Sequence, residues 1–248
     1  MENLEQKLKY LRLSAIGRTL QSRNAYALEH KLSYMEFLEL LIEDECTNRQ
    51  ANAYKQRLAK SKLSQQKTLN NYDFSYQPEL DKRLIQELAG CRFIDQKKNI
   101  IFMGKPGVGK THLANAIGLA ALDQGYRVVF AHANSLIEQL NRSRADHSHQ
   151  RILSNVINAD LLIIDELGFR MIPQHGIGDF FEVIRSRYET KPIIITSNRN
   201  FEEWGEIFGD AVLASAIIDR MVHHAYVFKI TGKSYRVKDY VELATENN

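Results

Sequence analysis

The stretch Gly104-Lys105-Pro106-Gly107-Val108-Gly109-Lys110-Thr111 decides the fold of this 248-residue chain. An apolar run at 99–103 comes directly before it, and a helix-forming run at 112–117 follows it. This strand–loop–helix order is the context in which the pattern G-x-x-x-x-G-K-[ST] forms a phosphate-binding loop. The glycines of such a loop let successive backbone N–H groups converge on an anion at a helix N-terminus. The sequence therefore predicts a nucleotide-binding site.

The same motif suggests a role for each of its residues. Lys110 would neutralise the β- and γ-phosphates of ATP, and the Thr111 hydroxyl would ligate Mg²⁺. ATP and Mg²⁺ are thus the expected cofactors. The other nucleotide-binding candidates in the loop and at the start of the helix are Gly104, Pro106, Gly107, Val108, Gly109 and His112.

Composition restricts the class of protein. With 44% hydrophobic and 25% charged residues, the chain can form an α/β domain and a smaller appendage. No apolar run approaches the ~20 residues of a membrane span, and the polar start of the chain does not resemble a secretory signal. Cys46 and Cys91 lie far apart and without metal-ligand spacing. We therefore expect a cytoplasmic protein with no membrane partner and no structural disulfide.

Three regions are expected along the chain. Residues 1–68 carry apolar positions at helical spacing, and Ser33 and Glu36 match a capping box, so this region is predicted to be an all-helical domain. Residues 69–98 are expected to form a linker and a lead-in helix. Residues 99–248 alternate between apolar strand patterns and helical patterns, which predicts a doubly wound α/β fold with a parallel sheet. The strands are expected at 99–103, 127–132, 161–165, 193–196 and 226–230.

Two of the expected strands end in polar residues that suit ATP hydrolysis. The run 161–164 delivers Asp165 and Glu166 to the carboxyl edge of the sheet, where ligands of doubly wound folds bind. Asp165 would hold Mg²⁺, and Glu166 would act as the general base toward the attacking water. Asn198 follows another expected strand and would contact the γ-phosphate or position that water. Alternatively, Ser197 and Asn198 only form the turn that leaves the strand.

Arg220 stands near the end of an amphipathic run at 213–221. It is either a salt-bridged surface arginine or an arginine finger that reaches the ATP of a neighbouring subunit. Such a finger can be worth about 10³–10⁵ in rate. The second role requires a homo-oligomer in the ATP-bound state.

Basic residues cluster in two places. No Asp or Glu occurs between Glu45 and Asp73, a stretch whose basic residues extend to Lys67. This stretch is either a solvated helix face or a track for nucleic-acid phosphates. A second basic group lies in the polar region before Asn158. The candidate DNA contacts are Arg49, Lys55, Arg57, Lys60 and Lys62 in the first group and Arg142 and Arg144 in the second.

Beyond these motifs, the chain resembles the IstB family of AAA+ helper ATPases over almost its whole length. The resemblance rests on the runs 104–114, 161–169 and 194–199, on the region around Trp204 and on residues 217–224. It implies an ATPase that assembles on duplex DNA without sequence specificity and recruits a cognate IstA-like transposase to target DNA. The residues that it places in AAA+ roles are Lys110, Thr111, Asp165, Glu166, Asn198 and Arg220.

The C-terminal region departs from the broad AAA+ pattern. Only 28 residues follow Arg220, too few for the helical lid that usually carries a second sensor arginine. We therefore expect a fold without a full lid, a truncation that the resemblance to IstB-like proteins also implies, and do not assign that role to Arg236. The linker residues Asp73 and Phe74 are the candidates that would cover the adenine.

Other functions fit part of this pattern. The main alternative is a DnaC-like helicase loader that acts on single-stranded DNA and a replicative helicase. A nucleotide-gated adaptor that hydrolyses little ATP is a further possibility, and a small-molecule kinase is the least favoured. A preference for duplex over single-stranded DNA would separate the transposition helper from the loader.

Overall fold

The computed structural model describes residues 2–237, so the last part of the predicted 99–248 region, 238–248, lies outside the described residues. The chain forms two compact units, Met1–Gln56 and Arg57–Asn248. The division falls within a helix, whereas the helical spacing of the sequence predicts a helical domain that extends to residue 68. It falls early because the last turn of that helix belongs to the second unit, where Leu58 is buried and Arg57 Nη2 donates to Leu122 O at 3.2 Å.

The first unit is helical, as predicted. It contains α1 (Glu2–Tyr10), α2 (Ser14–Glu29) and most of α3 (Tyr34–Ser61). The capping box at the start of α3 is confirmed, because Ser33 N and Oγ both donate to Glu36 Oε2 at 2.7 Å and Glu36 N donates back to Ser33 Oγ at 3.3 Å. The buried Glu45 carboxylate joins α3 to α2 by accepting from Ala15 N at 2.8 Å.

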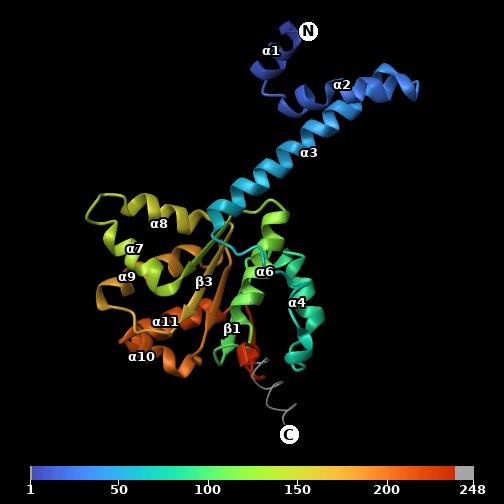
Figure 1. The fold of residues 1–248 in the computed structure, drawn as a ribbon. Helices are drawn as coiled ribbons and strands as arrows, with labels where there is room; N and C mark the ends of the chain where they lie inside the picture. Colours follow the sequence, from blue (N-terminus) through green and yellow to red (C-terminus); the bar gives the residue numbers. More distant parts are fainter. Residues whose placement is uncertain (1, 238–248) are drawn as a thin grey trace. The chain divides into compact units, whose positions relative to one another are not determined.

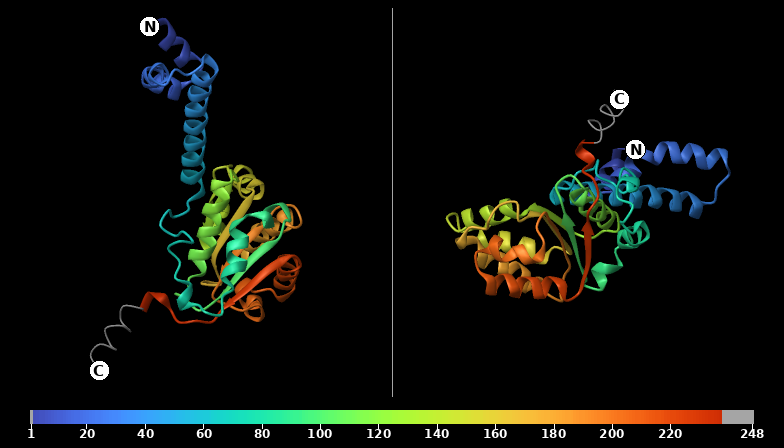
Figure 2. Two further views of the ribbon diagram at one scale, coloured as in Figure 1. Left: turned by 90° about the vertical axis from the view of Figure 1, so that its right-hand side faces the viewer. Right: turned by 90° about the horizontal axis from the view of Figure 1, so that it is seen from below.

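The second unit is built on a parallel sheet (Figures 1 and 2). Its strand order is β2-β3-β4-β1-β5, and every pair of neighbours is parallel. Because the chain leaves β1 for the far edge of the sheet and returns on the other side of β1, the sheet is doubly wound. All five predicted strands are present, as β1 (Asn99–Gly104), β2 (Val128–His132), β3 (Leu161–Leu167), β4 (Ile193–Ser197) and β5 (Ala225–Ile230).

Helices cover both faces of this sheet. Before β1 come η1 (Phe74–Tyr76), α4 (Lys82–Ala89) and α5 (Arg92–Asp95). Asp81 fixes the start of α4, because its Oδ1 accepts from Arg83 N and Leu84 N at 2.9 and 3.1 Å. The crossover helices are α6 (Lys110–Asp123), α7 (Ala133–Arg142), α8 (His149–Asn158), α9 (Gln174–Arg187), α10 (Trp204–Phe208) and α11 (Ala211–Val222), with η2 (Phe201–Glu203) before α10 and η3 (Tyr235–Val237) after β5.

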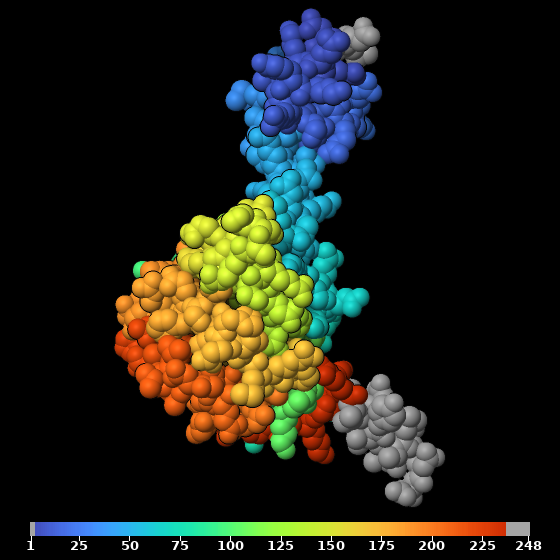
Figure 3. All heavy atoms as spheres, turned by 90° about the vertical axis from the view of Figure 1, so that its left-hand side faces the viewer, coloured from blue at the N-terminus to red at the C-terminus, as the bar shows by residue number. Residues whose placement is uncertain are grey.

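The core sits on the central strands. Ile100, Ile101 and Phe102 of β1 are fully buried, as are Ile163 and Ile164 of β3. Alternate residues of these strands therefore face α6 on one side and the cluster of α7, α9, α10 and α11 on the other (Figure 1). Residues of α7, α8 and α9 form one outer face of this unit (Figure 3). Among residues 2–237, none of the helices has both the length and the apolar character that crossing a membrane requires.

Candidate nucleotide-binding site

The loop between β1 and α6 has the backbone conformation that its motif predicts. Gly107 and Gly109 have φ values of +85° and +96°, in the left-handed region that favours glycine. Space is limiting as well. A Cβ at Gly107 would lie 2.0 Å from Ser234 Oγ, and a Cβ at Gly109 would lie 2.6 Å from Cε2 of Tyr72. Only glycine fits these two positions, and the loop they form leads directly into the N-terminus of α6.

Lys110 folds back over this loop. Its Nζ donates to Gly104 O at 2.6 Å and to Lys105 O at 2.8 Å. Burial lowers the pKa of Lys110. The negative charges of Asp165 and Glu166 oppose this shift, whereas the positive charge of Arg236 adds to it. The ammonium is therefore held by neutral carbonyls, a set of partners that phosphate oxygens can replace with stronger, charge-assisted hydrogen bonds.

Asp165 forms the buried centre of the site. Its Oδ1 accepts from Thr111 Oγ1 at 2.8 Å and from Thr196 Oγ1 at 2.5 Å. Asp165 is fully buried, and its Oδ2 has no hydrogen-bond partner, although His132 Nδ1 lies 3.4 Å away. A buried carboxylate oxygen beside a threonine hydroxyl is a hard-oxygen donor set that suits Mg²⁺. Thr111 and Asp165 therefore fit the metal that the sequence predicts.

Glu166 stands at the mouth of the site. Its carboxylate is exposed, and its backbone has a φ of +60°, which is uncommon for a residue other than glycine. Its N–H donates to Thr196 Oγ1 at 2.9 Å, so Thr196 holds both acidic residues. His132, at the end of β2, places Nδ1 3.6 Å from Glu166 Oε2. Sequence reasoning did not select Thr196 or His132, although both lie at the carboxyl edge of the sheet.

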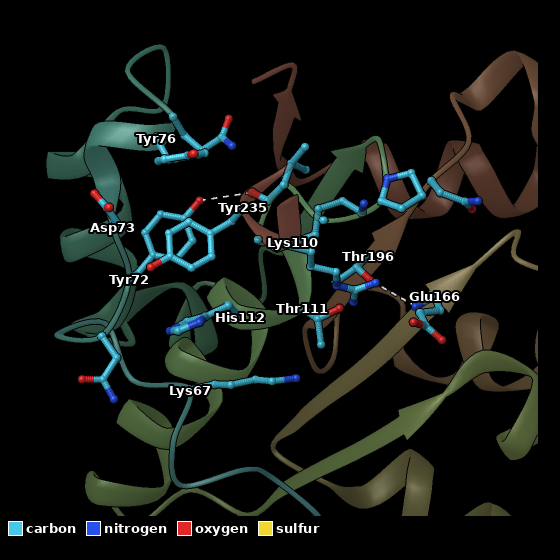
Figure 4. Close-up of a pocket in the computed structure, with 18 of the residues that line it drawn as sticks. Lys67, Tyr72, Asp73, Tyr76, Lys110, Thr111, His112, Glu166, Thr196 and Tyr235 are labelled. Atoms are coloured by element: carbon cyan, nitrogen blue, oxygen red, sulfur yellow. Dashed lines mark hydrogen bonds between the residues drawn. The ribbon is translucent and has the colours of Figure 1, made fainter. Parts of the chain in front are cut away.

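A cavity of about 260 Å³ lies over the loop (Figure 4). One part is lined by Glu166, Thr196 and Asn198, beside Lys110 and Thr111. Besides the loop itself, His112 and Phe169, the rest is lined by Lys67 just before the predicted linker, by residues of that linker and by residues near the end of the described chain. Those residues are Lys67, Asn71, Tyr72, Asp73, Tyr76, Gln77, Tyr235 and Arg236.

Of the two adenine candidates, one lines the cavity and one does not. Asp73 lines it, but Asp73 Oδ1 also caps η1 by accepting from Ser75 N at 3.0 Å. Phe74 is absent from the lining, because its ring packs edge-on against Tyr72, with the centroids 4.8 Å apart. The aromatic wall is made instead by Tyr72, Tyr76 and Tyr235, and the last two rings lie 5.2 Å apart.

Within residues 2–237, the segment after β5 closes the cavity, and these residues include no helical lid after β5. Tyr235 N donates to Gly107 O at 2.9 Å, and Gln77 Nε2 donates to Lys233 O at 3.0 Å. These bonds bring Arg236 into the cavity lining. No role was predicted for Arg236 from the sequence. The pairing of β5 with β1 could have pointed to Arg236. It places the end of β5 beside the phosphate-binding loop, with Ile230 opposite Gly104.

Comparison with known proteins establishes the family. A family model described as IstB-like ATP binding protein matches residues 6–242. The chain belongs to the IstB-like ATP-binding proteins. The ATP-binding protein of insertion sequence IS5376 from Geobacillus stearothermophilus is 41% identical over 238 residues, which cover 96% of this chain and 95% of that protein. The corresponding protein of IS21 from Pseudomonas aeruginosa is 39% identical over 239 residues, covering 96% and 90%.

Solved structures confirm the fold of this IstB-like protein. The DnaC helicase loader aligns with a TM-score of 0.57 and 22% identity, over 67% of this chain and 97% of that one. AMPPCP-bound DnaA from Aquifex aeolicus aligns with a TM-score of 0.57 and 23% identity, over 75% and 57%. At these identities the likeness concerns the fold alone, and it is the P-loop AAA+ fold that the sequence predicted.

Arg220 of the IstB-like chain lies outside the cavity. It is on α11, where its Nη1 donates to Ala216 O at 2.9 Å and its guanidinium lies 5.3 Å from the centre of the Phe181 ring. The structure therefore does not bring Arg220 to the nucleotide site of its own chain.

The DNA-contact candidates of the IstB-like protein fall into two groups. Four of them have partners within the chain: Arg49 with Glu45, Arg57 with Leu122 O, Arg142 with Glu138, and Arg144 with the buried Asp179 at 2.6 Å. Lys55, Lys60 and Lys62 are exposed and make no ion pair with any residue from 2 to 237. These three are the candidates most available to external phosphates.

Proposed function

We propose that this IstB-like protein is an Mg²⁺-dependent ATPase of insertion-sequence transposition. In this proposal it assembles on duplex DNA as a homo-oligomer, without sequence specificity, and recruits an IstA-like transposase to the target. The observation that carries the ATPase assignment is the acidic pair. Asp165 is bound to Thr111 and leaves Oδ2 without a hydrogen bond, while Glu166, the next residue, points its exposed carboxylate to the cavity that Lys110 lines.

The position of each residue in the site suits one step of ATP hydrolysis. Mg²⁺ held by Thr111 and Asp165 would neutralise charge on the phosphate oxygens. Glu166 accepts a proton from water as the water oxygen bonds to the γ-phosphorus. The bond between that phosphorus and the β-phosphate oxygen breaks, and Lys110 stabilises the charge left on ADP. Asn198, which lines the cavity near Glu166, is placed to orient the water.

Two further residues support the hydrolytic site. Thr196 fixes Asp165 through its hydroxyl and Glu166 through its backbone. Arg236 lines the same cavity and is close enough to lower the pKa of Lys110, so it is placed to meet the phosphates of a bound nucleotide. A cation supplied by the segment after β5 would take over a task that other AAA+ proteins give to the lid.

The position of Arg220 is consistent with the proposed assembly. Because Arg220 lies on α11 and outside the cavity of its own chain, an arginine finger at this position has to act on a neighbouring subunit. Exposed Lys55, Lys60 and Lys62 support binding to a phosphate backbone rather than to base edges. Relatives named for insertion sequences, at 39–41% identity along nearly the whole chain, favour transposition over helicase loading.

The test is an assembly experiment with the Glu166→Gln variant, which should bind ATP without turning it over. Sedimentation and electron microscopy would compare this variant with ATP and Mg²⁺ on duplex and on single-stranded DNA. We expect large ATP-dependent assemblies on duplex DNA, and none with Lys110→Ala as the control. Assemblies confined to single-stranded DNA would transfer the assignment to a helicase loader.

A further inference from the structure

The segment 57–72, here called the strap, lies lengthwise along α6. Arg57 Nη2 donates to Leu122 O at the C-terminal end of α6. Leu63 packs at Gly118, where an added Cβ would lie 3.0 Å from Leu63 Cδ1. Farther along the strap, Ser64 contacts Asn115, Thr68 contacts His112 and Tyr72 contacts Val108. The contacts therefore recur every three or four residues along the helix and into the loop. The strap therefore follows one face of α6 from its end to the nucleotide site.

Asn115 fixes the middle of the strap. This asparagine is 2% exposed. Its Oδ1 accepts from Ser64 N at 2.8 Å, and its Nδ2 donates to Ser64 O at 2.8 Å and to Lys67 O at 3.1 Å. One turn closer to the loop, His112 Nε2 lies 2.6 Å from Thr68 O. The backbone of Lys67 is thus held on both sides by side chains of the phosphate-loop helix.

The Lys67 side chain enters the nucleotide cavity. It lines the cavity together with Thr111, His112 and Glu166, and in Figure 4 it extends from the strap past His112 in the direction of Thr111. Lys67 is half-buried. Within the part of the chain that the structure describes, it forms no ion pair, although the carboxylates of Asp73 and Glu166 line the same cavity. A half-buried lysine whose ammonium has no anionic partner is suited to a ligand that brings negative charge.

We propose that Lys67 is a phosphate-binding residue of the ATP site, supplied by the strap. The inference rests on the proposed function only in that the cavity binds ATP. Lys110 approaches the phosphates from inside the loop, whereas Lys67 approaches them from the side of the strap. By sequence Lys67 belongs to the basic stretch between Glu45 and Asp73 and resembles a DNA contact. Its position assigns it to the nucleotide instead.

The experiment measures binding of fluorescent mant-ATP and mant-ADP to the full chain, with Mg²⁺ and without DNA. Because a hydrogen bond to a charged group is lost, Lys67→Ala should weaken mant-ATP binding about tenfold. Lys67→Arg should stay within about threefold, since it keeps the charge. The control is Lys229→Ala, an exposed lysine of β5 outside the cavity lining, and it should bind as the unaltered chain does. Weaker binding of mant-ATP alone would place Lys67 at the γ-phosphate. Weaker binding of both nucleotides would place it at the α- or β-phosphate.

Equal binding of mant-ATP by Lys67→Ala and the unaltered chain would overturn the proposal. Thermal melting separates a binding role from a structural one. The melting temperature without nucleotide should be unchanged in Lys67→Ala, while its rise with ATP should shrink. A lowered melting temperature shared by Lys67→Ala and Lys67→Arg would show a structural role and count against the proposal. If the unaltered chain itself fails to bind mant-ATP while folded, the proposed function fails first.

Discussion

At the scale of single residues, Thr196 joins the two acidic residues of the site. Its hydroxyl donates to Asp165 and accepts from the backbone of Glu166. Thr196→Val keeps the shape of the side chain and removes both bonds, so Glu166 loses its fixed position. We expect kcat for ATP hydrolysis to fall by about tenfold or more while mant-ATP affinity changes by less than about threefold.

Thr196→Ser is the matched control, since it keeps the hydroxyl, and it should retain most of the turnover. Steady-state ATPase assays and mant-ATP titrations on the same preparations measure both quantities. A Thr196→Val variant with normal turnover would show that Glu166 is positioned without this hydroxyl.

Arg187 shows what a buried cation does outside the nucleotide site. Arg187 is 1% exposed, and its guanidinium donates to the carbonyls of Val156, Ile157, Ala159 and Pro192 at 2.6 to 2.9 Å. Burial lowers the pKa of Arg187. Arg187→Met would leave these carbonyls without their donor, at a cost of about 3 kcal/mol in the free energy of unfolding.

Arg185→Met provides the comparison for Arg187. Arg185 is on the same helix, but it is exposed, and its one ion pair among residues 2–237 is with Glu182. The expected change for Arg185→Met is below about 0.5 kcal/mol. Chemical denaturation of both variants measures the difference. Equal stability of the two would mean that the carbonyls at the end of α8 find other partners.

At the scale of elements, the strap and α6 should behave as one unit. Asn115→Leu removes the three hydrogen bonds that tie Asn115 to the strap, with little change in volume. Amide hydrogen exchange should therefore become faster at residues 63–72 and stay slow in β1. Nucleotide affinity should fall in parallel, since Lys67 and Tyr72 both belong to the strap.

The control for Asn115→Leu is Gln124→Ala at the exposed end of α6, where one bond of 3.3 Å to Ala89 O is lost. Mass-spectrometric hydrogen exchange with and without ATP would compare the two variants. Unchanged exchange at residues 63–72 in Asn115→Leu would show that the strap is held by its apolar contacts alone.

The elements also show what the sequence could and could not predict. The five strands and the loop were predictable because their signals are local: apolar runs, glycines and the residues that end each strand. Capping by Ser33 and Glu36 is local as well. The aromatic wall of the cavity was not predictable, because Tyr76 and Tyr235 meet only when the segment after β5 folds back over the loop. The proposed role of Lys67 was not predictable either. A lysine suits the phosphates of DNA and of ATP equally well in the sequence, and only the packing of its segment on α6 favours ATP.

At the scale of the whole molecule, the proposed binding to DNA is electrostatic and should depend on salt. Lys60 and Lys62 are exposed and unpaired within residues 2–237. Replacing both by alanine should weaken duplex binding for every sequence alike and reduce the slope of log affinity against log salt by about 2. Fluorescence anisotropy across a salt series measures that slope. Lys97→Ala, another exposed lysine, is the control.

The proposed arginine finger makes a prediction that only an assembly can fulfil. Glu166→Gln lacks the general base but keeps Arg220, whereas Arg220→Ala lacks the finger but keeps the base. If Arg220 acts on a neighbouring subunit, each variant alone should hydrolyse almost no ATP. A mixture, however, should regain a fraction of the activity wherever a Glu166→Gln subunit presents its Arg220 to the site of an Arg220→Ala subunit. Activity should rise with protein concentration and peak near equal proportions. If Arg220 served only its own chain, no mixing ratio would restore turnover, and the position of Arg220 outside its own cavity makes restoration the expected result.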